Sequence, residues 1–194
     1  MGTPLVRLLA EKHVVHVTSR RSHPSSGNIQ YLQGNAHDFT FLDAVLSARH
    51  YDAIVDFMVW DHEFKEALPR FLSHTDQYVY ISSARVYAQS DNPITEETPR
   101  LLDVSDDDVY LNTNEYALAK AREEDLIRSY GRKNYTIIRP SITYNKYRLQ
   151  WGVLEKEAWL YRALHHRSIV FSEDIADKLT AMTHGDDVAK GINA

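Results

Sequence analysis

Stretches with the spacing of β-strands alternate along this chain with stretches that have the spacing of helices. The strand candidates are residues 14–18, 28–32, 54–58, 78–82 and 135–139, and the helix candidates are residues 3–12, 41–49, 61–73, 113–130 and 153–166. A strand, a helix and a second strand in succession form a crossover connection, and repeated crossovers build a mainly parallel sheet with helices on both faces. We therefore expect an α/β fold with a doubly wound parallel sheet. Ligands bind such sheets beyond the carboxyl ends of the strands, so residues that directly follow a strand are the candidates for a site.

The overall composition excludes several classes of protein. With 194 residues, of which 43% are hydrophobic and 25% charged, the chain has the size of one domain, or of one domain with a small appendage. It contains no cysteine, which excludes disulfides, thiolate metal sites and a cysteine nucleophile. The ten histidines show no metal-ligand spacing, so we expect no metal site. The net charge of -5 and the absence of a basic cluster argue against a nucleic-acid partner.

The sequence has no pattern of a membrane or secretion segment. No stretch is apolar over the length needed to cross a bilayer, and the N-terminus lacks a basic segment followed by an apolar one. We expect a cytoplasmic protein with no membrane partner. The acidic run at residues 103–108 is interpreted as a solvated loop.

The segment NEYALAK, residues 114–120, places Tyr116 and Lys120 four positions apart on a predicted helix. Asn112 is the expected N-cap, with Glu115 reaching back toward it, so the helix begins close to Tyr116. Side chains four apart lie on the same face, so both can reach one ligand. A tyrosine has a pKa of about 10, and a neighbouring cation and the N-terminal helix field both lower it, which makes the phenol usable as a base. In a chain with twelve tyrosines, the same spacing also arises by chance as a solvated surface pair.

Two serines follow a predicted central strand in the segment YISSARVYA, residues 80–88. Ser82 and Ser83 are expected to leave the sheet at its ligand-binding edge. Serines at strand ends commonly form turns, but a hydroxyl there also has the chemistry to bond a substrate oxygen and share in proton transfer.

Taken together, the motifs resemble the extended short-chain dehydrogenase/reductase family, in its NAD(P)-dependent epimerase/dehydratase branch. They are YISSARVY (80–87), YALAK (116–120), YTIIRPSITYN (135–145) and THGDDVAKGI (183–192). Their order and spacing also match, and the resemblance covers nearly the whole chain from Gly2 onward. It implies a Rossmann-like fold and chemistry on a nucleotide sugar, as an epimerase, dehydratase or reductase.

The resemblance also implies roles for individual residues. Tyr116 would be the acid/base that removes a proton from a sugar hydroxyl while hydride passes to the nicotinamide. Lys120 would lower the pKa of the tyrosine and bond the nicotinamide ribose, and Ser83 would orient the hydroxyl. These roles agree with the chemistry, because alcohol oxidation needs a base for the proton and a cofactor for the hydride.

The implied cofactor is NAD or NADP. The residues assigned to it are Gly2, Ser19, Arg20, Asn35, Ala36, Phe57, Met58, Ser82, Tyr116, Lys120 and Pro140. Arg20 stands where an acidic residue would select NAD, so NADP is slightly favoured, although a solvated loop arginine explains it almost as well. Asn35 replaces the usual aspartate at the adenine and still offers an amide. The bulk of Phe57 and Met58, where relatives have small residues, either narrows the cofactor channel or packs in the core.

The beginning of the family pattern is incomplete in this chain. Gly2 resembles the last glycine of the phosphate-binding turn, so the first strand and the two earlier glycines are missing. That strand is central in the sheet order, so we expect an unfilled slot between its two neighbours. Three explanations stay open: a fragment of a longer protein, which we favour, a misplaced start, or a truncated relative without strong cofactor binding. Residues 1–145 would form the incomplete dinucleotide-binding domain, and residues 146–194 part of a small substrate domain.

Two classes of function therefore compete. The first is an NAD(P)-dependent enzyme that uses Ser83, Tyr116 and Lys120. The second is a non-catalytic Rossmann-fold binding module, or an inactive fragment, that has lost strong cofactor binding. The resemblance also implies the helix that carries Tyr116 as the candidate surface for a homodimer.

Overall fold

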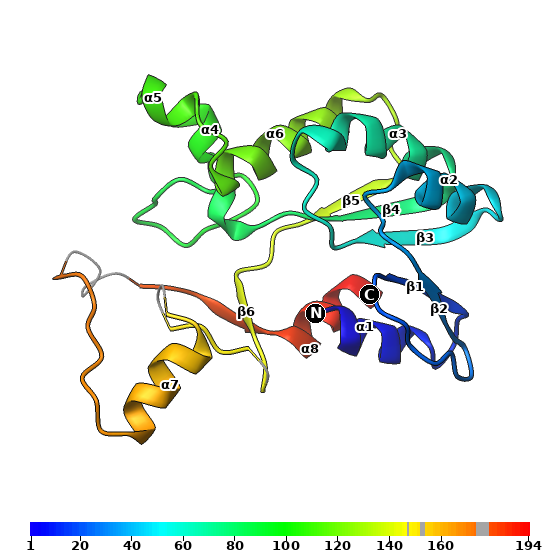
Figure 1. Ribbon diagram of the computed structural model, residues 1–194. Helices are drawn as coiled ribbons and strands as arrows, with labels where there is room; N and C mark the ends of the chain where they lie inside the picture. The colour runs from blue at the N-terminus through cyan, green and yellow to red at the C-terminus, as the bar shows by residue number, and fades with distance from the viewer. Residues whose placement is uncertain (147, 152–153, 174–178) are drawn as a thin grey trace.

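A computed structural model describes residues 1–146, 148–151, 154–173 and 179–194. In chain order its helices and strands are α1 (Gly2–Leu9), β1 (Val15–Ser19), β2 (Ile29–Gln33), α2 (Phe39–Ser47), β3 (Tyr51–Asp56), η1 (Asp61–Glu63), α3 (Phe64–Ser73), β4 (Thr75–Ile81), η2 (Ala84–Val86), α4 (Leu101–Val104), α5 (Asp108–Leu111), α6 (Tyr116–Ser129), β5 (Tyr135–Ile138), β6 (Ile142–Tyr144), α7 (Lys156–Leu164), β7 (Met182–His184) and α8 (Gly185–Asn193). Figure 1 shows α2, α3 and α6 on one side of strands β3 to β5, with α1 and α8 on the other side.

All the ladders between named strands are parallel, as the crossover pattern predicts. β1 pairs with β2, β4 lies between β3 and β5, and β6 pairs with β7. The chain thus has the expected Rossmann-like α/β fold with helices on both faces of a parallel sheet. In the C-terminal part, α8 packs against α1, which brings the two ends of the described chain together (Figure 1).

The expected split in the sheet is present between β1 and β3. These strands belong to separate sheets, so no ladder joins them in the described chain. Side chains bridge the two sheets instead. The rings of His16 and Tyr51 pack edge to face with their centres 5.7 Å apart, and the Arg49 guanidinium lies 3.1 Å from the Nε2 atom of His16. A hollow of about 230 Å³ beside this bridge is lined from β1, β2, α2 and Tyr51.

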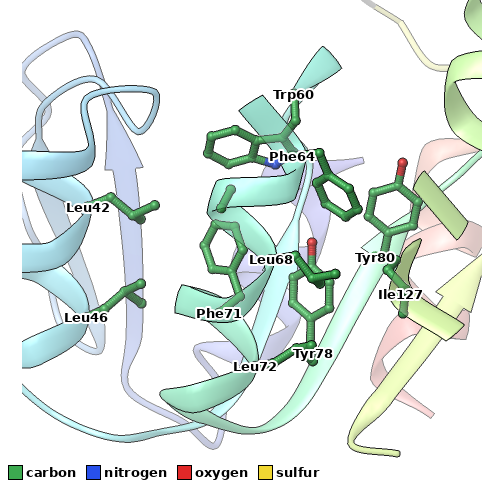
Figure 2. Packing of buried hydrophobic residues seen from close by; sticks show 11 residues of the cluster. Leu42, Leu46, Trp60, Phe64, Leu68, Phe71, Leu72, Tyr78, Tyr80 and Ile127 are labelled. Carbon is green, nitrogen blue, oxygen red and sulfur yellow. The ribbon is translucent and has the colours of Figure 1, made fainter. Parts of the chain in front are cut away.

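The core lies between the β3-β4-β5 sheet and helices α2, α3 and α6. Helix α3 supplies Phe64, Leu68, Phe71 and Leu72, whose spacing puts them on one face. Figure 2 shows these side chains directed toward Tyr78 and its neighbours on the strands. Burying one such apolar side chain contributes about 1.5–3 kcal/mol, so this face fixes how the helix lies on the sheet.

The beginning of α6 differs from the expectation. Asn112 does not cap it, since this residue ends α5, and Glu115 is the N-cap, with its carboxylate accepting a bond from the Ala117 amide at 2.7 Å. The acidic run is also not a plain loop, because Asp107 caps α5 and Asp103 pairs with Arg100. At α5 and at α6, an acidic side chain thus accepts a bond from a backbone amide of the first helical turn, and the sequence pattern had not located either helix N-terminus correctly. Helix α6 ends before Gly131, whose positive φ of 79° suits a left-handed residue after a helix.

A close packing contact at Gly34 gives a test of the fold. A Cβ at this position would overlap the ring of Phe41, whereas a Cβ at Gly191 in α8 would meet no atom within 4 Å. We expect Gly34→Ala to lower the free energy of unfolding by about 1–3 kcal/mol, because the phenyl ring must move. Gly191→Ala is the matched control and should be neutral or stabilising by up to about 1 kcal/mol. Urea unfolding of both variants measures the difference, and equal stabilities would contradict the contact.

Within the residues described, no helix combines the length and the apolar character that crossing a bilayer requires.

Candidate functional site

The two serines after β4 have different surroundings. Ser83 is half-buried at the strand end and caps η2, its hydroxyl oxygen accepting a bond from the Arg85 amide at 3.2 Å. Ser82 is only 2% exposed, and its hydroxyl donates to Glu124 at 2.6 Å. Both serines follow the last residue of β4, as expected, but the hydroxyl of Ser82 is bonded to a buried carboxylate, whereas that of Ser83 is at the strand end.

Tyr116 is the first residue of α6, and its side chain is 39% exposed. The guanidinium carbon of Arg85 lies 5.8 Å from the centre of its ring, and the same guanidinium donates to the Glu115 carboxylate at 2.6 Å. These contacts tie η2 to the beginning of α6. The structure thus brings Ser83 and Tyr116 to one region of the carboxyl edge of the sheet.

The side chain of Lys120 is buried in the core. It is 3% exposed, and its ammonium donates to the Tyr80 hydroxyl at 2.9 Å and to Glu123 at 3.2 Å. Tyr80 also donates to Glu123, and burial followed by the charge of Glu123 raises the pKa of its phenol. In the described chain, the hydrogen bonds of the Lys120 ammonium go to Tyr80 and Glu123, and Tyr116 is not among its partners. Helical spacing fixes only the Cα positions, and a buried carboxylate turns the long lysine side chain into the core.

A charged cluster that the sequence interpretation missed holds α6 against β5. Glu124 is fully buried and receives two bonds from Arg139, at 2.8 and 2.6 Å. Arg100 and Arg128 approach the same carboxylate at 3.4 and 3.3 Å. The sequence placed both partners of this cluster close to residues already singled out, because Glu124 lies one helical turn after Lys120 and Arg139 directly precedes Pro140. The cluster anchors the second half of α6, the helix whose first residue is Tyr116.

Another buried carboxylate ends β3. Asp56 accepts bonds from the Trp60 indole at 2.6 Å, the Tyr78 hydroxyl at 2.7 Å and the Met58 amide at 2.8 Å. Burial raises the pKa of the Asp56 carboxyl, against the effect of these bonds. The bonds turn the indole of Trp60 into the core, while Phe57 stays 39% exposed at the strand end. Trp60 thus belongs to the core cluster and Met58 packs against it, whereas Phe57, the residue directly after β3, is exposed.

The residues assigned to the adenosine end lie at neighbouring strand ends. Ser19 ends β1, and its carbonyl accepts a bond from the Gly34 amide, which follows β2, at 2.9 Å. Arg20 and Asn35 are exposed there, and Ala36 is buried. Gly2 begins α1, and the carbonyl of Pro140 accepts the Ala84 amide at 2.9 Å. Arg20 and Asn35 thus follow strands of the β1-β2 sheet, Phe57 follows β3 of the other sheet, and Ser82 and Lys120 are engaged in the core.

Comparison with known proteins identifies the family. Residues 67–181, more than half of the chain, match the model of an NAD-binding family described as male sterility protein. The chain belongs to this NAD-binding family. The membership agrees with the expected resemblance to the NAD-binding short-chain dehydrogenases/reductases, and the structural neighbours share its fold.

Solved structures of NAD complexes share the fold over 99% of this chain. One is dTDP-glucose 4,6-dehydratase from Bacillus anthracis in complex with NAD, at 17% identity and a TM-score of 0.69, with 66% of that chain covered. Another is a variant of UDP-glucuronic acid 4-epimerase from Bacillus cereus with NAD and a fluorinated sugar nucleotide, at 14% identity and a TM-score of 0.72, with 68% of that chain covered. At such identities the likeness establishes the fold.

A curated relative from a plant has a different kind of name. The chain is 30% identical over 139 residues to the chloroplast stem-loop binding protein of 41 kDa b from Arabidopsis thaliana. The alignment covers 72% of this chain and 33% of that protein, so the chain spans about a third of the relative's length.

Proposed function

We propose that the protein of which this chain is part carries out NAD(P)-dependent epimerase/dehydratase chemistry on a nucleotide sugar. The observation that carries the proposal is the exposed Tyr116 at the first turn of α6, held beside η2 and Ser83 at the carboxyl edge of a Rossmann-like sheet. The NAD complexes of proteins with the same fold support it.

In the proposed reaction, the phenol of Tyr116 removes the proton from a sugar hydroxyl and later returns one. The hydroxyl of Ser83 orients the reacting alcohol. The nicotinamide, when bound, supplies the hydride acceptor that no side chain provides. For Lys120 to bond a ribose as proposed, its ammonium has to exchange Tyr80 and Glu123 for the ligand.

The cofactor is NAD or NADP, with NADP slightly favoured on account of Arg20, which is exposed at the end of β1. A guanidinium there has the geometry to bond a 2'-phosphate. We expect Arg20→Gln to weaken NADPH binding about tenfold and to leave NADH binding unchanged, because one charge-assisted contact is lost. Fluorescence titration with both dinucleotides measures this, with Arg162→Gln on α7 as the control. Equal losses for both dinucleotides would count against a 2'-phosphate contact.

Turnover is tested directly by incubating the protein with nucleotide sugars and NAD or NADP. The absorbance of the reduced nicotinamide and chromatography of the sugar products are the two readouts. Formation of an epimerised, dehydrated or reduced sugar that is lost in Tyr116→Phe would support the proposal. Dinucleotide binding without any change in the sugars, over a panel of nucleotide sugars, would overturn it.

A second candidate function is a binding module without catalysis. It is favoured by Lys120, whose ammonium is used in the core, and by the relative that is named for binding a stem-loop. The net charge of -5 does not favour a polyanion. Titration with a stem-loop RNA and with NADH in parallel separates the two candidates, since the enzyme must bind the dinucleotide.

Three further features belong to the proposal. Residues 146–194 would contribute part of the substrate-binding region, and the protein would act in the cytoplasm. A homodimer would use α6, where a groove of about 400 Å³ is lined by residues of η1, α3 and α6 and the preceding loop. This groove does not include Tyr116, so dimerisation would leave the site open.

A further inference from the structure

We infer that Arg85 and Glu115 are positioning residues for Tyr116, acting as one unit that holds its ring toward Ser83. The inference rests on the proposed function, and it concerns two residues to which the resemblance assigns no role in the reaction. Neither contributes an atom to the proposed reaction.

Glu115 makes contacts in three directions. Its carboxylate accepts from the Ala117 amide at 2.7 Å, from the Arg85 guanidinium at 2.6 Å and from the Tyr110 hydroxyl at 3.2 Å. It is therefore the N-cap of α6 and at the same time the anchor of η2 and α5. Because it directly precedes Tyr116, these bonds fix the backbone from which the phenol projects.

Arg85 completes the arrangement from the other side. Its backbone amide donates to the Ser83 hydroxyl oxygen, and its guanidinium reaches Glu115 and faces the Tyr116 ring. One residue thus contacts both side chains that the proposed reaction needs. The pair is more than half exposed on the arginine side, so its contribution to stability is small. A role in orientation explains the pair better than a role in folding.

The chain offers a matched control. Arg70 also pairs with an acidic residue, Asp43, at 2.8 Å, and also lies over an aromatic ring, that of Phe39, at 4.3 Å. It lies on α3, away from η2. Arg70→Met therefore removes the same kind of ion pair and ring contact without touching Tyr116.

The test compares Arg85→Met, Glu115→Gln, the double variant, Arg85→Lys and Arg70→Met. Glu115→Gln keeps an acceptor for the helix cap but loses the charge. Protein carrying ring ¹³C-labelled tyrosine gives one NMR signal for Tyr116, assigned with Tyr116→Phe. We expect both single variants to shift or broaden this signal, the double variant to add nothing further, Arg85→Lys to restore part of it, and Arg70→Met to leave it unchanged.

Kinetics give the second readout. We expect each single variant to lower kcat about tenfold with little change in KM, because a base that is misplaced by a fraction of an ångström still allows binding. The double variant should be no worse than the more impaired single variant. A Tyr116 signal that is unchanged in Arg85→Met, or effects of the two substitutions that simply add, would overturn the inference. If the unchanged protein turns over no nucleotide sugar, the proposed function fails, and the NMR comparison still decides whether the pair positions Tyr116.

Discussion

Tyr116→Phe should lower kcat by roughly 10²–10⁴-fold, because positioned acid/base groups contribute a factor of this size. The substitution removes one oxygen and keeps the aromatic ring. The contact between that ring and Arg85 therefore remains, and so does the cap of α6 by Glu115, which lies outside the substituted side chain. Dinucleotide affinity, measured by fluorescence titration, should stay nearly unchanged, so that the loss appears in the chemical step.

Tyr130→Phe is the matched control for this prediction. Tyr130 ends the same helix and is 43% exposed, close to the 39% of Tyr116. The control should keep full turnover. Undiminished activity in Tyr116→Phe would remove the assigned role, and the binding module would then become the better candidate.

Local sequence patterns predicted the alternation of helices and strands from α1 to β4, as well as α6, β5, α7 and the place of Tyr116, but they did not predict α4, α5, β6, β7 or α8. The apolar spacing of α3 and the β-branched runs of the strands report burial directly, residue by residue. Ser83 was also foreseen, because the carboxyl ends of parallel strands mark the ligand-binding edge whatever the detailed packing.

The direction of a long side chain could not be predicted in the same way. Whether Lys120 faces a ligand or the core depends on Tyr80, which lies forty positions earlier, and on Glu123. The indole of Trp60 likewise turns inward because Asp56 accepts its N–H group. Such choices are made by pairs of polar groups from different elements, and a helical or strand period in one segment contains no information about the partner.

Glu124→Ala should lower the free energy of unfolding at pH 7 by about 3–5 kcal/mol, the range found when one partner of a buried ion pair is removed. The carboxylate is fully buried and receives bonds from Arg139 and Ser82. Without it, the Arg139 guanidinium, which is 13% exposed, loses its carboxylate partner in a place that water reaches poorly. Urea unfolding followed by circular dichroism measures the change. Glu157→Ala on α7, where the side chain is 74% exposed, should stay within about 0.5 kcal/mol of the unchanged protein.

The pH dependence of this destabilisation separates the charge of Glu124 from its packing. Burial by itself would raise the pKa of the Glu124 carboxyl, but the bonds from Arg139 and Ser82 and the charges of Arg139 and Arg128 outweigh it and lower the pKa. A carboxyl with a lowered pKa in the folded state adds stability above its unfolded pKa of about 4.3, and this stability is lost as the pH falls through the folded value. The difference between the unchanged protein and Glu124→Ala should therefore be largest near neutral pH and shrink below about pH 4. Asp56, whose raised pKa acts in the opposite sense, is present in both proteins and cancels in this difference. A difference that stays constant down to low pH would mean that the space filled by the side chain, and not its charge, holds α6 against β5.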